Sequence, residues 1–354
     1  MPIESLSHMP KKTLILPGLI DVHVHLREPG GEHKEDFFSG SQSALAGGIT
    51  TVMAMPNTYP PLVTFDQWSI AQQTADRKSL CDVFLYAGAS GEHIAGLACL
   101  QTEAPALKLY MDQTYGPLRV QGLAQLTAVA RAWHPDKIIA VHAEGESVAI
   151  AIALSAALNR RVHLCHISRK EEIELIAAAK ANGLPITCEV TPHHLFLTDA
   201  DAQRLGSLGD MRPLLAEQGD VDALWEHINT TIDCIASDHA PHTLEEKQSD
   251  NPPPGVPGLE SSLPLMLTAA AQGRLTYERL VELMYTNPRR IFDLPEQPET
   301  WVEVDPLARY TFPDHPLYTK CGWSPFEGMD MQGHIRRVVF KGKEIVRDGI
   351  VRHS

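Results

Sequence analysis

The chain has 354 residues, 44% of them hydrophobic, and a formal net charge of −14. One barrel with a small appendage fits this length better than two equal domains, and an acidic chain repels phosphate backbones, which excludes a typical nucleic-acid binder. The six cysteines form no CxxC pair, no apolar run reaches membrane-spanning length, and the first residues lack a signal-peptide core. We therefore expect a cytoplasmic protein with free thiols and no membrane partner.

Eight short apolar runs alternate with helical patterns along the chain. Near-continuous apolar runs are typical of parallel strands that are covered on both faces. The predicted strands are Leu19–His25, Thr51–Met55, Cys81–Gly88, Ala106–Tyr110, Ile138–Ala143, Val162–Ser168, Pro185–Val190 and Thr231–Asp238. The predicted helices between them include Phe37–Ala46, Leu123–Trp133, Ser147–Leu158 and Lys170–Ala181. This alternation predicts an α/β fold, the (β/α)8 TIM barrel.

The pattern changes after the eighth predicted strand. The Pro-rich segment Asn251–Gly258 cannot form a helix or an interior strand, so we expect a long loop over the barrel mouth. Helical patterns resume at Ser262–Ala271 and Tyr277–Tyr285, and a hairpin turning at Gly342 is predicted near the C-terminus. We expect residues 17–300 to form the barrel, and residues 1–16 and 301–354 to form a small β-rich appendage.

Polar side chains follow four of the predicted strands, at the barrel end where catalytic groups usually lie. The first strand ends in His23 and His25, which face the same way because they are two residues apart. His142, His166 and Asp238 end the fifth, sixth and eighth runs. Each of these alone is well explained as a satisfied polar residue. Their convergence on one mouth instead favours a metal site.

Lys108 lies inside the apolar run Ala106–Tyr110. Burying a charged lysine is costly, so this side chain either reaches solvent at the strand end or loses its charge. A neutral amine can react with CO2 to form a carbamate, an anion whose two oxygens can bridge two metal ions. Because four neutral histidines supply no bridging anion, we favour the carbamate.

Several segments resemble dihydroorotases of the amidohydrolase superfamily, most closely the dihydroorotase domain of the animal multifunctional pyrimidine-biosynthesis protein. They are PGLIDVHVHLREPG (Pro17–Gly30), MPNT (Met55–Thr58), LKLY (Leu107–Tyr110), VHAE (Val141–Glu144), LCHISRKEE (Leu164–Glu172), TCEVTPHHL (Thr187–Leu195), IASDHAPHT (Ile235–Thr243) and PPPGVPGLE (Pro252–Glu260). The likeness extends from Pro17 to about Val351. It implies an amidohydrolase barrel with two zinc ions and a carboxylated lysine.

The resemblance also implies a set of metal ligands. His23, His25 and Asp238 would bind the first zinc, His142 and His166 the second, and carboxylated Lys108 would bridge them. Cys165 and Glu189 match residues that are associated with a further metal, which makes a third zinc possible. A buried core thiol remains the alternative for Cys165, because regular strand alternation turns it away from His166.

Substrate contacts follow from the same resemblance. It implies that Arg27, Asn57 and His242 hold the substrate carboxylate, that Arg212 and the backbone of Pro254 and Gly255 meet the ring, and that Thr114 and Tyr115 form the tip of a closing loop. Arg27 lies just beyond the two histidines, and its planar fork suits a carboxylate. Surface ion pairs are the alternative for both arginines. Relatives carry Phe where this chain has Tyr115, which puts that contact in doubt.

The implied activity is the reversible cyclisation of N-carbamoyl-L-aspartate to L-dihydroorotate, with Asp238 acting as base and then as acid. The implied partners are a second copy in a homodimer and aspartate transcarbamoylase. Allantoinases and hydantoinases share the barrel and metals, but their substrates lack a ring carboxylate, so Arg27 favours dihydroorotate. A non-catalytic scaffold would show gaps among the metal ligands, and all six positions are filled.

Overall fold

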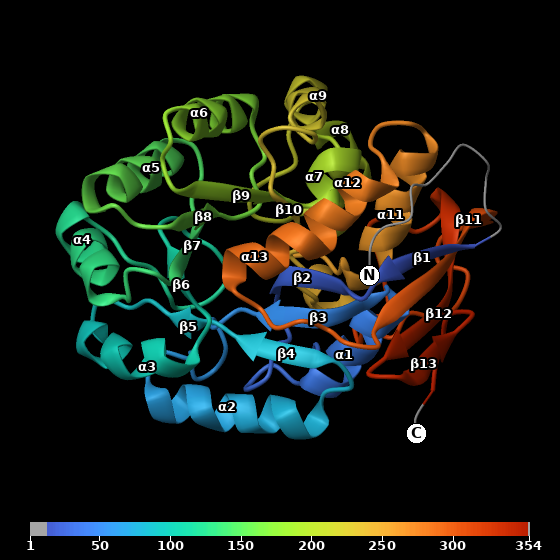
Figure 1. Cartoon of the computed structure of the whole chain (residues 1–354), viewed down its shortest axis with the longest axis horizontal. Helices are drawn as coiled ribbons and strands as arrows, with labels where there is room; N and C mark the ends of the chain where they lie inside the picture. The colour runs from blue at the N-terminus through green and yellow to red at the C-terminus, as the bar shows by residue number, and fades with distance from the viewer. Residues whose placement is uncertain (1–12, 353–354) are drawn as a thin grey trace.

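The computed structural model describes residues 13–352, and its central feature is a barrel of parallel strands (Figure 1). The strands form two sheets, of order β2-β3-β4 and β5-β6-β7-β8-β9-β10. A bridge between Val24 and His239 connects the first strand to the end of the last, and the His25 N–H donates to the His239 carbonyl at 2.7 Å. The predicted TIM barrel is therefore confirmed.

Each predicted apolar run overlaps at least one barrel strand. The strands are β2 (Leu19–Val24), β3 (Ile49–Ala54), β4 (Asp82–Leu85), β5 (Ala87–Gly88), β6 (Ala106–Tyr110), β7 (Ile138–His142), β8 (Val162–Leu164), β9 (Ile186–Val190) and β10 (Cys234–Ile235). The sixth and eighth runs are longer in our prediction than in the structure. Their backbones leave the extended conformation, and His166 and Asp238 have positive φ angles of 35° and 44°.

Helices cover the outside of the barrel (Figure 1). They are α1 (Phe37–Ala46), α2 (Phe65–Lys78), α3 (Leu97–Glu103), α4 (Leu123–Ala132), α5 (Glu146–Leu158), α6 (Lys170–Ala181), α7 (Pro192–Phe196), α8 (Asp199–Leu205), α9 (Gln218–Glu226), α10 (Leu244–Lys247), α11 (Leu259–Ala271), α12 (Tyr277–Val281) and α13 (Asn287–Phe292), with short turns η1 (Ile94–Gly96), η2 (Gly206–Gly209) and η3 (Glu282–Thr286). α1 begins at a capping box in which the Asp36 carboxylate accepts from the Ser39 N–H.

The core has an inner and an outer part. Inside the barrel, Ile20, Val22, Met53 and other small apolar side chains form one buried cluster. Phe292 of α13 joins this cluster and meets the Tyr86 ring edge-on, with ring centroids 6.1 Å apart. A larger apolar cluster fills the space between the strands and the surrounding helices. The interior is thus filled largely by apolar side chains.

A five-stranded antiparallel sheet lies beside the barrel (Figure 1), in the order β1-β11-β12-β13-β14. Its strands are β1 (Leu14–Pro17), β11 (Trp301–Thr311), β12 (Asp330–Phe340), β13 (Lys343–Arg347) and β14 (Ile350–Val351). The predicted hairpin is confirmed as β12 and β13. Residues 1–12 and 353–354 of the predicted appendage lie outside the described residues, and the division of the chain at residues 17 and 300 stays a prediction.

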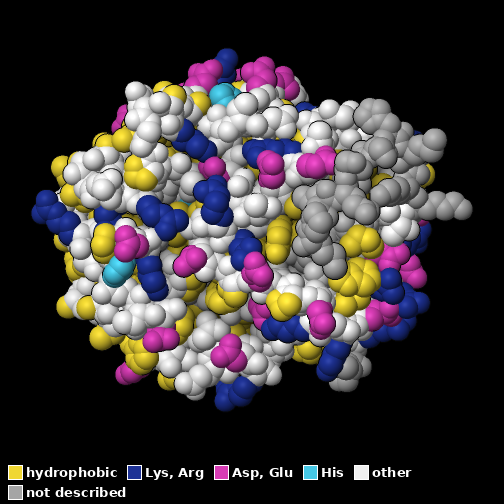
Figure 2. Space-filling view, in the orientation of Figure 1, with side chains coloured by type: hydrophobic (Ala, Val, Ile, Leu, Met, Phe, Trp, Pro, Cys, Tyr) yellow, Lys and Arg dark blue, Asp and Glu magenta, His cyan; other side chains and the backbone are white. Residues whose placement is uncertain are grey.

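The Pro-rich segment forms a loop, as predicted, and within it Val256 pairs with His239 through an isolated bridge. Among residues 13–352, no helix combines the length and apolar character needed to cross a membrane. On the face drawn in Figure 2, basic and acidic side chains are interspersed rather than gathered into one basic patch. That face offers no broad electrostatic surface for a phosphate backbone.

Candidate metal centre

His23 and His25 lie together with Asp238 at the barrel mouth. The two imidazole centroids are 5.5 Å apart, and Asp238 Oδ1 lies 3.1 Å from His25 Nε2 and 3.4 Å from His23 Nε2. Burial lowers the pKa of His25 to about 4, so its ring is neutral near neutral pH. Burial alone would raise the pKa of Asp238, but His23 and His25 outweigh it and lower the pKa, which leaves an ionised carboxylate.

His142 and His166 form the second pair of rings. His142 Nδ1 lies 2.8 Å from His166 Nε2, and the His166 and His23 centroids are 5.2 Å apart. Burial lowers the pKa of both His142 and His166, so both rings are neutral, which is the form that binds metals. The buried Nδ1 of His166 has no hydrogen-bond partner within residues 13–352. Such a buried atom is expected to have a ligand.

Three residues at this mouth have backbone angles that side chains other than glycine rarely adopt. Arg27, His166 and Asp238 have φ values of 62°, 35° and 44°. Each angle costs about 1–3 kcal/mol and persists because surrounding contacts hold it. Because the chain turns sharply at these points, side chains that a continuous strand would separate come together at the mouth.

Lys108 lies in the middle of β6 and is fully buried. Its Nζ donates to Cys165 Sγ at 3.0 Å, and it also lies 5.1 Å from the centroid of the Tyr110 ring. The structure therefore places this side chain inside the barrel rather than at the surface, which removes the snorkelling alternative. Cys165 itself follows the end of β8.

Glu189 of β9 forms a second layer behind the histidines. It contacts His23 Nδ1, and its other oxygen lies 3.0 Å from His163 Nε2. Burial raises the pKa of Glu189, but His23 and His163 outweigh that effect and lower it below the ordinary range. Ligand atoms of His23, Cys165 and Glu189 lie within 4.8 Å of one another, as do those of His23, His166 and Asp238. Because β8 ends at Leu164, regular strand alternation does not extend to Cys165 and His166.

The donor set fits a metal site. It combines buried neutral imidazoles, an ionised carboxylate and an imidazole nitrogen that no described group satisfies. The predicted ligands His23, His25, His142, His166, Asp238 and Lys108 all lie at this end of the barrel interior and are at most 9% exposed. The residues thus satisfy the chemistry of a metal centre, with Glu189 orienting His23 from behind.

Arg27 and two other polar side chains adjoin the cluster. Arg27 donates through Nε to the Pro241 carbonyl at 3.1 Å, and its Nη2 lies 3.1 Å from His242 Nε2. Asn57 Oδ1 lies 2.8 Å from His25 Nδ1, and Asn57 Nδ2 donates to the Tyr115 carbonyl at 2.8 Å. The three residues predicted to hold a carboxylate therefore border the metal cluster, and Asn57 connects it to the loop that carries Tyr115.

The remaining predicted substrate contacts lie on nearby loops. Half-buried Arg212 forms an ion pair with Asp210, and the Gly255 N–H donates to the Asp210 carbonyl at 2.9 Å. Gly255 has φ 133°, and a Cβ there would lie 2.6 Å from the Ala240 carbonyl oxygen, so this position requires glycine. Pro254 precedes it in the same loop. Thr114 is half-buried and Tyr115 is 38% exposed.

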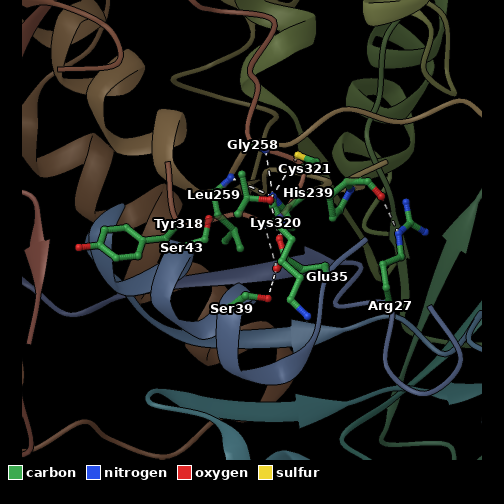
Figure 3. A network of polar contacts seen from close by, with 12 residues as sticks. Arg27, Glu35, Ser39, Ser43, His239, Gly258, Leu259, Tyr318, Lys320 and Cys321 are labelled. Carbon is green, nitrogen blue, oxygen red and sulfur yellow. Dashed lines mark hydrogen bonds and ion pairs between the residues drawn. The ribbon is translucent and has the colours of Figure 1, made fainter. Parts of the chain in front are cut away.

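Sequence reasoning missed several buried residues around the site. Lys34 contacts His242, and Lys247 donates to three carbonyls of the loops that carry Arg212 and Gly255. Figure 3 shows Glu35 near Ser39 and Lys320, and His239 near Gly258 and Leu259. Lys34, Glu35 and Lys247 are buried but lie outside the quoted motifs, and a charged residue near a loop normally faces solvent, so the sequence carried no signal for their burial.

Comparisons with known proteins identify the family. Residues 12–153 match the family model described as Dihydro-orotase-like. The chain is 47% identical over 350 residues to the multifunctional protein CAD of Squalus acanthias, an alignment that covers 99% of this chain and 16% of that protein. It is 35% identical to the dihydroorotase of Halobacterium salinarum, and that alignment covers 89% of this chain and 82% of the enzyme.

Solved structures agree on the fold. An L-hydantoinase from Arthrobacter aurescens superposes with a TM-score of 0.91 at 26% identity, covering 96% of this chain and 87% of that one. An inactive dihydroorotase-like domain of a Chaetomium thermophilum multifunctional protein gives 0.83 at 27% identity, covering 97% of both chains.

The barrel and its cluster of histidines define the chain as an amidohydrolase with a metal centre. Within that class, the archaeal match over most of both chains shows that it belongs to the dihydroorotase family. The chain spans only 16% of the length of the multifunctional relatives that it also matches.

Proposed function

We propose that this chain is an active dihydroorotase, which interconverts N-carbamoyl-L-aspartate and L-dihydroorotate. The observation that carries the proposal is the position of Arg27 and His242 directly beside the cluster of His25 and Asp238. A cyclic amide that carries one carboxylate needs both a hydrolytic centre and a cationic anchor next to it. The likeness to dihydroorotases along the chain supports the same substrate.

The metal assignment is part of this proposal. His23, His25 and Asp238 would hold one zinc ion, His142 and His166 a second, and Lys108 would bridge the two as a carbamate. When bound, the two ions would supply a nucleophilic water at neutral pH and polarise the amide carbonyl. Cys165 and Glu189 would be the ligands of a possible third zinc.

Asp238 is the residue that would move the proton. Its ionised carboxylate can accept a proton from the attacking water and then deliver it to the leaving ring nitrogen. In the direction of ring closure the sequence is reversed, so Asp238 must first be protonated. We therefore expect ring closure to be favoured by lower pH and ring opening by higher pH.

The neighbouring side chains would bind and orient the substrate. Arg27, Asn57 and His242 would hold the carboxylate, while Arg212 and the backbone of Pro254 and Gly255 would meet the ring. Thr114 and Tyr115 would exclude water when their loop closes over the substrate. A homodimer, association with aspartate transcarbamoylase and a cytoplasmic location complete the proposal.

A hydantoinase-type activity is the second candidate, because the L-hydantoinase shares nearly the whole fold. The buried Arg27 favours the carboxylate substrate, since hydantoins carry no ring carboxylate to pair with it. A non-catalytic scaffold is the weaker candidate, because each residue proposed as a zinc ligand is present and buried at the mouth.

The test is a comparison of substrates by the purified, zinc-loaded chain and its Asp238→Asn variant. We expect turnover of dihydroorotate and of N-carbamoyl-L-aspartate well above that of hydantoin or allantoin. Asp238→Asn should lose roughly 10²–10⁴-fold in both directions while retaining zinc, because an amide cannot shuttle the proton. Preference of the wild type for hydantoin would overturn the substrate, and near-normal activity of the variant would remove Asp238 from proton transfer.

A further inference from the structure

Lys34 is a buried lysine in the loop between β2 and α1, and the proposed reaction does not yet use it. Its side chain is 5% exposed. Its Nζ lies 3.1 Å from His242 Nδ1, 3.0 Å from the Tyr115 hydroxyl and 2.8 Å from Glu246 Oε1. An ammonium group has three donors, and this one has three partners. One of them is a ring predicted to bind the substrate carboxylate, and another is at the tip of the predicted lid.

His242 lies between two cationic groups that can only donate. Arg27 Nη2 is 3.1 Å from Nε2, and Lys34 Nζ is 3.1 Å from Nδ1. Burial, with Arg27 and Lys34, lowers the pKa of His242, so the ring is neutral. A neutral imidazole has one N–H and one lone pair, so it can accept from only one of the two cations. The other cation must face the ring's N–H. That cation and the N–H then direct their hydrogens into the same space.

The two cations lie equally close to the ring, so the tautomer depends on which N–H can find an acceptor. On the Nδ1 side, Glu246 Oε2 is 3.6 Å away, too far to accept a hydrogen bond, whereas Lys34 is within range to donate one. On the Nε2 side lies Arg27, two residues past the proposed ligand His25. With Nδ1 accepting from Lys34, the Nε2–H and the Arg27 guanidinium converge beside the metal cluster. A carboxylate oxygen entering there would satisfy both donors.

We propose that Lys34 is a positioning residue that fixes His242 in its Nε2–H tautomer and, through the Tyr115 hydroxyl, latches the lid over the same carboxylate. The latch rests on a second contact of the same ammonium. Tyr115 accepts from Nζ at 3.0 Å, and its ring meets the His242 ring edge-on, with centroids 5.0 Å apart. Phe at this position could stack but could not accept the hydrogen bond. The lid tip and the anchor therefore share one lysine.

This inference rests on the proposed function for its substrate, but its primary test does not. In zinc-loaded protein with ¹⁵N-labelled histidine, the His242 ring can be assigned by its loss in His242→Gln. We expect a protonated Nε2 and an unprotonated Nδ1 in the wild type, and a shift towards mixed tautomers in Lys34→Met. A protonated Nδ1 in the wild type, or an unchanged ring in Lys34→Met, would overturn the proposal.

Kinetics with dihydroorotate provide the second test. Lys34→Met should raise KM by about tenfold or more and change kcat less, because it weakens an anchor rather than the hydrolytic group. Tyr115→Phe should have a smaller effect, and adding it to Lys34→Met should cost little more, since both remove the same hydrogen bond. Lys180→Met is the matched control, because Lys180 donates to the Thr231 carbonyl away from the mouth.

Two further outcomes keep the tests separable. A KM for Lys34→Met within twofold of the wild type would overturn the anchor role, whatever the tautomer. If Lys34→Met unfolds, Lys34→Gln keeps a polar side chain at the position and is subjected to the same two measurements. A wild type that fails to turn over dihydroorotate would contradict the proposed function, and the ¹⁵N spectrum would still report on Lys34 and His242.

Discussion

The metal cluster and the polar network around Glu35 and Glu260 both bury charged side chains. They differ in whether the protein itself supplies hydrogen-bond partners for the buried polar atoms. In the network, Glu260 accepts from the Ser43 hydroxyl at 3.0 Å and from the backbone N–H groups of Tyr318 and Thr319 at 3.0 Å. In the cluster, His166 Nδ1 has no partner within the described chain. A buried polar group without a partner costs roughly 1–3 kcal/mol. The network therefore holds the fold together, whereas the cluster keeps binding capacity for something that is not protein.

The two regions meet at His239, next to Asp238. Its Nδ1 accepts from the Gly258 N–H at 3.1 Å, and its Nε2 lies 3.4 Å from Glu35 in the network (Figure 3). Its carbonyl accepts from the His25 N–H. His239 thus connects the two regions. From the difference between them, we expect changes in the cluster to abolish function and leave folding intact. Changes in the network should lower stability first.

The largest expected effect is at Lys108. Lys108→Ala should lose zinc and activity together, because the proposed carbamate would be the bridging anion that offsets the charge of two ions. Zinc content, measured by atomic absorption, and turnover are the readouts. Lys137→Ala is the control, since Lys137 is a lysine that donates to the Ala104 carbonyl outside the site. Two zinc ions per chain in Lys108→Ala would show that the bridge comes from another group.

Arg27 should give the next largest effect. Arg27→Ala should lower kcat/KM for dihydroorotate by roughly 10²-fold, or about 3 kcal/mol, because the carboxylate loses its charged partner. Zinc content should stay unchanged, which separates the anchor from the metal cluster. Steady-state kinetics and metal analysis on the same preparation test both statements. A kcat/KM within a few-fold of the wild type would contradict the anchor role.

The sequence predicted the barrel because its strands are nearly continuous apolar runs, and β6 and α1 have the predicted bounds. The predicted runs extend beyond β8 and β10 because tertiary contacts hold the left-handed backbones of His166 and Asp238, and no local pattern encodes those contacts. The ends of the predicted strands indicated the four histidines and Asp238 as ligands, and the resemblance divided them between two ions. The motifs could not reveal the network, since contacts such as Thr319 with Glu35 join residues 284 positions apart.

A smaller and pH-dependent effect is expected in the network. Burial raises the pKa of Glu260 from 4.5 to about 7 despite its hydrogen bonds. Because the folded-state pKa of Glu260 lies above its unfolded value, the protonated side chain contributes to the free energy of unfolding. That contribution is complete below about pH 4.5 and is lost as the pH rises through 7. Urea unfolding from pH 5 to 8 should therefore show the wild type losing roughly 1–3 kcal/mol relative to Glu260→Gln. Parallel curves for the two proteins would mean that Glu260 stays ionised throughout.

The smallest expected effect tests the connection between the two regions. Trp323, in the C-terminal segment, donates through Nε1 to the His242 carbonyl at 2.8 Å and is 3% exposed. Trp323→Phe removes this hydrogen bond and some apolar area, whereas Trp133→Phe removes similar area from a buried indole whose N–H has no partner within residues 13–352. The difference between the two variants in unfolding free energy should be at least about 1 kcal/mol, because Trp323→Phe loses a hydrogen bond whereas Trp133→Phe removes an N–H that has no partner. Trp323→Phe alone should also raise KM a few-fold, because the His242 backbone loses a fixed point. Equal KM values for both variants would show that the C-terminal segment supports the fold without positioning the anchor.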